Sequence, residues 1–136
     1  MPLKAPFVAL EFLMKSFING MDFQMRLYKN DLTPNNDTVL ADFVECDFSG
    51  YPAGGIVIPS FPSGTLIPPR WVSSGSPLTF NHDGGPTLNV VYGYYVIWMA
   101  QNEILWAERD PLGPKTMQAL GDSYIVTPRI SCRSEF

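Results

Sequence analysis

One stretch in the second half of the chain, Val90–Arg109 (VVYGYYVIWMAQNEILWAER), limits the folds that this sequence can adopt. Its first ten residues are almost all β-branched or aromatic, which is the composition of a well-packed strand. Ala100-Gln101-Asn102 then interrupts the run before EILWAER resumes it. Two strand-like runs joined by about three residues predict a β-hairpin, with Asn102 in a left-handed turn position.

Bulky residues alternate onto both faces of the first run, which predicts a strand covered on both sides. Gly93 is the exception, and a glycine inside such a strand indicates a bulge or a close neighbouring backbone. In the second run Trp106 alternates with Ile104, so both are expected to face the core. The residues predicted to form this core hairpin are Tyr92, Gly93, Tyr94, Trp98 and Trp106.

The N-terminal stretch Ala5–Gly20 is the helical candidate of the chain. Pro6 suits a first helical turn, and Asn19-Gly20 is a good C-terminal stop. Glu11 and Lys15 interrupt its apolar residues, so it does not predict a membrane span. The chain therefore divides into a helical arm, 1–20, and a β-domain, 21–136. Four apolar residues spaced along the arm predict a contact with another subunit or another partner, or a lid over the β-domain: Phe7, Leu10, Met14 and Phe17.

The rest of the chain alternates short strand-like runs with turns, helped by 13 prolines and 11 glycines. This pattern, with a single short N-terminal helix, predicts an all-β fold: an antiparallel β-sandwich or jelly roll. Asp110–Gly121 is expected to be a loop. The further strands are expected at Phe23–Asn30, Ala41–Phe48, Ile56–Ile58, Thr65–Ile67, Arg70–Val72, Leu78–Phe80 and Ser123–Cys132.

The charge and the reactive residues argue against several classes of function. A net charge of −4, with nine scattered lysines and arginines, does not predict binding to nucleic acid. The single histidine, His82, is expected in a solvated turn, and Cys46 and Cys132 as free structural thiols. Five carboxylates in 31–47 are expected to be solvated rather than to bind Ca²⁺. The sequence thus predicts neither an enzyme nor a cofactor nor a metal site.

Four segments carry a resemblance to a known family: MRLYKNDLTPNNDTVLADFVECDFSGY, VVYGYYV, ILWAER and GDSYIVTPRIS. Together they resemble small proteins of tailed-phage virions, and the similarity is greatest to jelly-roll capsid cement (decoration) proteins, which are commonly trimeric. The resemblance implies a virion structural protein, assembled in the bacterial cytoplasm, with the phage major capsid protein and its own copies as partners. It implies no catalytic residues.

Three classes of function follow from these observations. The first is a cement protein that stabilises the shell as a homotrimer. The second is a tail fibre or baseplate module that binds a host surface glycan, for which the tryptophans and tyrosines would form a stacking platform. The third is a hydrolase built around His82; the sequence lacks the glycine elbow, and a triad would need an acid from elsewhere in the chain than the adjacent Asp83.

Overall fold

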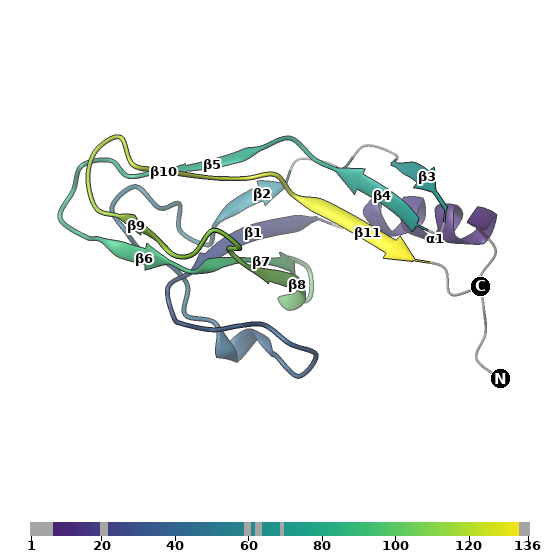
Figure 1. Ribbon diagram of the computed structural model, residues 1–136, viewed down its shortest axis with the longest axis horizontal. Helices are drawn as coiled ribbons and strands as arrows, with labels where there is room; N and C mark the ends of the chain where they lie inside the picture. The colour runs from purple at the N-terminus through teal and green to yellow at the C-terminus, as the bar shows by residue number, and fades with distance from the viewer. Residues whose placement is uncertain (1–6, 20–21, 59–60, 62–63, 69, 134–136) are drawn as a thin grey trace.

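The computed structural model describes residues 7–19, 22–58, 61, 64–68 and 70–133. These residues form one helix and antiparallel strands (Figure 1), so the predicted all-β sandwich with one short N-terminal helix is confirmed. The elements are α1 (Phe7–Asn19), β1 (Phe23–Tyr28), the 3₁₀ turn η1 (Leu40–Asp42), β2 (Ile56–Ile58), β3 (Thr65–Ile67), β4 (Arg70–Ser74), β5 (Leu78–Asn81), β6 (Asn89–Val91), β7 (Gly93–Trp98), β8 (Glu103–Arg109), β9 (Lys115–Met117), β10 (Ser123–Val126) and β11 (Arg129–Arg133).

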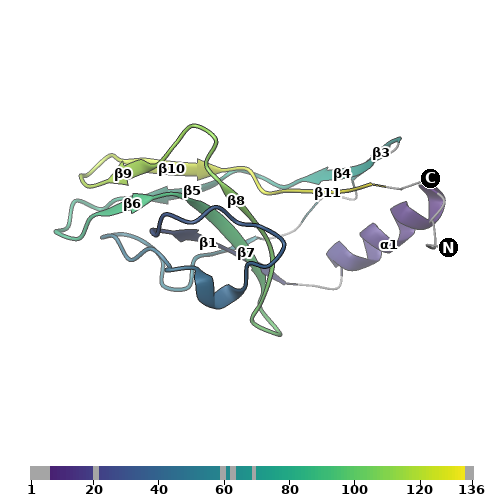
Figure 2. The same ribbon diagram turned by 60° about the horizontal axis from the view of Figure 1, so that its bottom comes forward.

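Two layers are visible in Figure 2. One is a four-stranded sheet in the order β2-β1-β7-β8. The other consists of three shorter ladders, β6-β9, β5-β10 and β3-β4-β11. Between the layers lies the main core, to which β1 contributes Phe23, Met25 and Leu27 as its alternation predicts. Trp71 and Phe80 enter from the opposite layer and are almost fully buried.

A second, smaller core lies on the other face of the sheet. Tyr28, Tyr95 and Ile97 point away from the main core and pack with Phe43. The ring of Phe43 stacks on Tyr95 with centroids 4.4 Å apart. Phe43 belongs to the segment expected as a strand at Ala41–Phe48, but that strand is not formed. The segment instead forms a loop, with the turn η1 and one isolated bridge between Tyr28 and Glu45. We call it the covering loop, because its Phe43 covers the outer face of the sheet.

The central hairpin has the predicted turn, because Asn102 has a φ of 51°. Two details differ from the prediction. First, the strand-like run that begins at Val90 is broken at Tyr92, so that β6 pairs with β9 while β7 joins the main sheet. Second, β8 contains a β-bulge, because Val96 pairs with Trp106 whereas Ile97 pairs with Ile104. The extra residue places Trp106 against the main core and Ile104 against the smaller one, so the prediction that they share a face is wrong.

The final strand is also broken, at Thr127-Pro128, and the opposite strand is broken at the same level. β4 and β5 pair with β11 and β10 as one long ribbon, visible along the top of Figure 1. Three residues separate β4 from β5, whereas two separate β10 from β11. Pro128 has no N–H for a ladder, but its carbonyl accepts a hydrogen bond from the N–H of Gly75 at 2.8 Å. The proline therefore sets the position at which the ribbon is broken.

Helix α1 packs against β4 and β11 at one end of the sandwich (Figure 2). Met14 and Phe17 fold back onto the main core, and the ring of Phe17 lies 5.6 Å from that of Phe23. For these two residues the structure agrees with the lid alternative. The side chains of Phe7 and Leu10, the other two residues of the predicted contact, lie outside the described part of the chain.

Burial of ionisable groups predicts a loss of stability at alkaline pH. Burial raises the pKa of Tyr28 and Tyr95 from 10.0, and that of Cys46 from 9.0, to about 12. Since these folded-state pKa values are raised, their stabilisation is complete below about pH 9 and is lost as the pH rises toward about 12. We expect the free energy of unfolding to fall by at least about 3 kcal/mol between about pH 8 and about pH 11. Urea denaturation at each pH measures it, and a constant value across this range contradicts the prediction.

Candidate functional site

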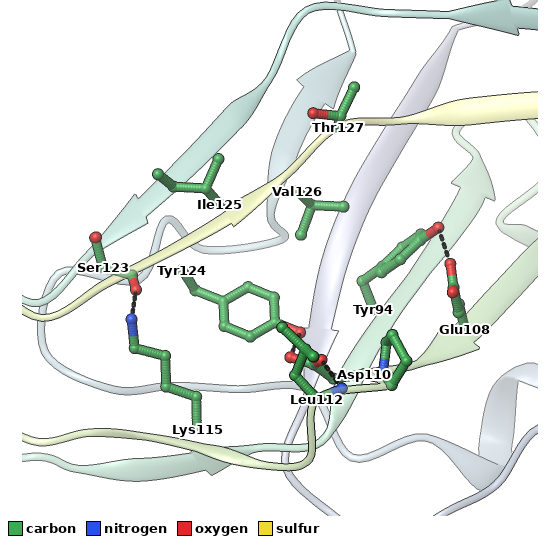
Figure 3. A pocket seen from close by; sticks show the side chains of 11 residues that line it. Tyr94, Glu108, Asp110, Leu112, Lys115, Ser123, Tyr124, Ile125, Val126 and Thr127 are labelled. Carbon is green, nitrogen blue, oxygen red and sulfur yellow. Dashed lines mark hydrogen bonds between the residues drawn. The ribbon is translucent and has the colours of Figure 1, made fainter.

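Two surface recesses are the candidates for a functional site. The first, which we call the polar hollow, has a volume of about 400 Å³ and lies between the end of β8, the loop after it and β10 (Figure 3). Its polar lining comes from both layers of the sandwich, with Tyr94 and Glu108 from the sheet and Tyr124 from the ribbon. The full lining is Tyr94, Glu108, Asp110, Pro111, Leu112, Lys115, Ser123, Tyr124, Ile125, Val126 and Thr127.

Hydrogen bonds fix the polar groups of this hollow. The phenol of Tyr94 donates to Oε2 of Glu108 at 2.9 Å, and the phenol of Tyr124 donates to Oδ2 of Asp110 at 2.8 Å. The backbone N–H of Leu112 donates to the other oxygen of Asp110. At the opposite end of the view in Figure 3, the ammonium of Lys115 donates to the carbonyl of Ser123. The hollow therefore holds two carboxylates, each oriented by a tyrosine.

The two tyrosines remain hydrogen-bond donors over the whole physiological range. Burial, and then the neighbouring carboxylate of Glu108, raises the pKa of Tyr94 well above its ordinary value. Burial and the hydrogen bond to Asp110 do the same to the pKa of Tyr124. Neither phenol can serve as a general base near neutral pH, because each keeps its proton.

The second recess, which we call the apolar groove, has a volume of about 540 Å³. It lies where α1, β8 and β11 meet, and both of these strands are at the edge of their sheets. Its lining is mostly apolar and consists of Met14, Phe17, Leu105, Trp106, Arg129, Ile130, Ser131 and Cys132. The described part of the chain offers no strand that pairs with the outer edges of β8 and β11.

His82 is buried, which corrects the expectation of a solvated turn histidine. It is 2% exposed and stacks against Phe48. Nδ1 accepts a hydrogen bond from the N–H of Gly84, so Nε2 carries the proton and donates to the carbonyl of Thr87 at 2.9 Å. With both ring nitrogens used by the turn that follows it, this imidazole has no free position from which to act as a catalytic base.

The carboxylates of 31–47 are dispersed by the fold. Asp31 pairs with Arg109, and Asp42 accepts a hydrogen bond from the N–H of Val39. Asp47 bonds Lys29 and Asn89, which together lower its pKa. Glu45 accepts a hydrogen bond from the phenol of Tyr51, so these four acids each have a structural partner of their own. No group of three or more histidines, cysteines and acids that could hold a metal ion occurs among the described residues.

Both cysteines are free, but their surroundings differ. Cys46 is buried in the main core, where desolvation raises its pKa to about 12 and keeps the thiol protonated and unreactive at neutral pH. Cys132 is half-buried and lines the apolar groove. Neither has a histidine that could activate it, since the only one, His82, is bonded elsewhere.

The predicted core hairpin residues lie in different surroundings. Gly93 is buried, whereas Tyr92 is half-buried beneath the guanidinium of Arg109, at 5.3 Å from ring centroid to Cζ. Tyr94 and Trp106 pack against the main core and also line the polar hollow and the apolar groove, respectively. Trp98 is half-buried and belongs to neither core cluster of the described residues.

Sequence reasoning missed the polar hollow as a site. Pairing of Tyr94 with Glu108 follows from the hairpin register and could have been found from it. In contrast, Asp110 and Tyr124 meet only because β10 lies in the opposite layer from β8, and no local pattern in the sequence signals that contact.

Comparisons with protein families, with curated proteins and with solved structures give no match for this chain. In the described part of the chain, no helix has the length and apolar character needed to cross a membrane.

Proposed function

We propose that this chain is a structural protein of a phage virion, which binds the capsid shell as a closed homo-oligomer and stabilises it without catalysis. A trimer is the assembly that the resemblance to cement proteins implies. In this proposal the major capsid protein is the partner, and the chain acts through burial of surface at subunit junctions.

The observation that carries this proposal is the apolar surface around α1. Met14 and Phe17 already pack inward, yet Val8 and Phe12, one helical turn apart, are 79% and 70% exposed on the same helix. A helix that is apolar on more than one face is typical of a buried element. Together with the apolar groove beside it, this surface supports an interface rather than a free helix.

The residues that carry the family resemblance act as structural ties, which also supports a framework role. The side chain of Asn30 bonds the backbone of Asp42 and Val44, and so holds the covering loop. Asp31 and Arg109, 78 residues apart, form an ion pair between the loop that follows β1 and the end of β8. None of these residues is left available for chemistry.

A tail module that binds a host glycan is the second candidate function. The polar hollow favours it, because carboxylates beside tyrosine rings are common in saccharide sites. The location of the chain in purified virions distinguishes the two. Mass spectrometry of separated heads and tails should find it in heads if it is a cement protein, and in tails if it is a glycan-binding module.

The apolar helix face gives a direct test of assembly. We expect light scattering of the purified chain to show a single oligomer, and the double variant Val8→Ser/Phe12→Ser to shift it by at least about ten-fold toward monomer. Leu120→Ser is the control, because Leu120 is 77% exposed but lies in a loop far along the chain from α1. A monomeric wild-type chain that also fails to bind emptied capsids contradicts the proposed function.

A further inference from the structure

We propose that the polar hollow is a receptor for an arginine side chain presented by a protein partner. The inference rests on the proposed function, in which that partner is the shell protein, and it names the chemistry of the contact.

The charged residues of the hollow give it a net negative charge. Glu108 and Asp110 contribute two negative charges and Lys115 one positive charge, so the hollow carries one net negative charge. The lysine is held on the Ser123 carbonyl, away from the Tyr94–Glu108 pair in Figure 3. Anionic ligands are therefore disfavoured, and a cation finds unpaired negative charge at the Glu108 end.

The hydrogen-bonding groups of the hollow favour a cationic ligand over a neutral one. Both phenol hydrogens are already donated to the carboxylates, so the two tyrosines offer a ligand only oxygen lone pairs. Oε1 of Glu108 has no hydrogen-bond partner among the described residues. A lining that offers mainly hydrogen-bond acceptors favours a ligand whose polar groups are all hydrogen-bond donors. Guanidinium has five N–H donors and no acceptor, whereas each saccharide hydroxyl must also accept.

The chain already contains one guanidinium that is bound by a tyrosine ring and a carboxylate together. The guanidinium of Arg109 lies over the ring of Tyr92 and bonds the carboxylate of Asp31. In the hollow a tyrosine and a carboxylate are again adjacent, but none of the described residues places a guanidinium there. Leu112 and Ile125 at the rim are 95% and 63% exposed, which provides apolar contact for the methylene stem of an arginine. The volume of about 400 Å³ is ample for one such side chain.

The test uses the full chain and N-acetyl-arginine amide as probe. In NMR titrations we expect saturable shifts confined to residues of the hollow, and no such shifts with the uncharged analogue N-acetyl-citrulline amide. Glu108→Gln keeps an acceptor for Tyr94 but removes the charge, and should weaken binding about ten-fold or more. Asp37→Asn, which removes an exposed carboxylate elsewhere, should leave binding unchanged.

Three results of the titration overturn the inference: no shifts with the arginine probe, equal binding of the citrulline analogue, or shifts at the hollow with methyl glucoside but not with the arginine probe. The last result would instead favour the glycan-binding function. Sedimentation with emptied capsids separates this inference from the proposed function. If wild type does not bind capsids, the proposed function fails; if wild type and Glu108→Gln bind equally, only the arginine receptor fails.

Discussion

Replacing Gly93 with alanine is expected to lower the free energy of unfolding by about 3 kcal/mol or more. A β-carbon built at this position collides with the carbonyl oxygen of Glu108 and comes within 2.7 Å of the phenol oxygen of Tyr28. The first contact is with backbone of the paired strand, which cannot move without opening the β7–β8 ladder. The second would displace a tyrosine that is fully buried and bonded to the carbonyl of Leu32.

Gly113→Ala is the matched control for this experiment. Gly113 has a φ of 90°, but an added β-carbon there meets nothing within 4 Å. Its cost is therefore limited to backbone strain, about 1–2 kcal/mol. Urea denaturation of both variants measures the difference. If Gly93→Ala costs no more than Gly113→Ala, the close approach of β8 to Gly93 is not a constraint on this fold.

Trp106→Ala is the second large effect, with an expected loss of about 3 kcal/mol. Its ring lies 5.9 Å from that of Phe23 and 6.2 Å from that of Phe61, so truncation opens a cavity beside the main core. We expect the lower end of the usual range for tryptophan, because this side chain is only half-buried at the apolar groove. Its indole N–H has no hydrogen-bond partner among the described residues, so the measured loss includes no lost hydrogen bond.

Trp98→Ala provides the comparison, since it removes the same side chain from the same hairpin. Trp98 lies in neither described core cluster, and its loss should cost at least about 1 kcal/mol less. The difference between the two variants in the denaturation midpoint is the quantity to measure. Equal losses would show that the β8 bulge does not direct Trp106 into the main core.

Much of the framework could be predicted from local patterns. Alternation in β1 identified its core face, and the spacing of the central runs gave the hairpin and the left-handed Asn102. These predictions succeeded because strand alternation and turn chemistry are encoded within a few residues. The short N-terminal helix was found for the same reason, from its capping residues and apolar spacing.

Other parts depend on contacts that are distant in sequence. The 41–48 segment has strand composition, but it becomes the covering loop because Phe43 packs against Tyr28 and Tyr95 on the outer face of the sheet. β9 was expected to be a loop and is a strand because β6 lies opposite it. His82 is buried by packing against Phe48, which no pattern around the histidine indicates. In each case tertiary packing overrides the local preference.

The position of β1 in the central sheet has a consequence for how the chain reaches this structure during synthesis. β1 ends up between β2 and β7, with Phe23 paired to both Ile58 and Trp98. At a translation rate of roughly 5–20 residues per second, Trp98 is made about 4 to 15 s after Phe23. Until then, β2 is the only neighbour of β1 in this sheet that has been made, and the edge of β1 that later pairs with β7 stays open. The nascent chain therefore passes through a period of several seconds in which a strand destined for the middle of the sheet has an unpaired edge that can pair with other chains.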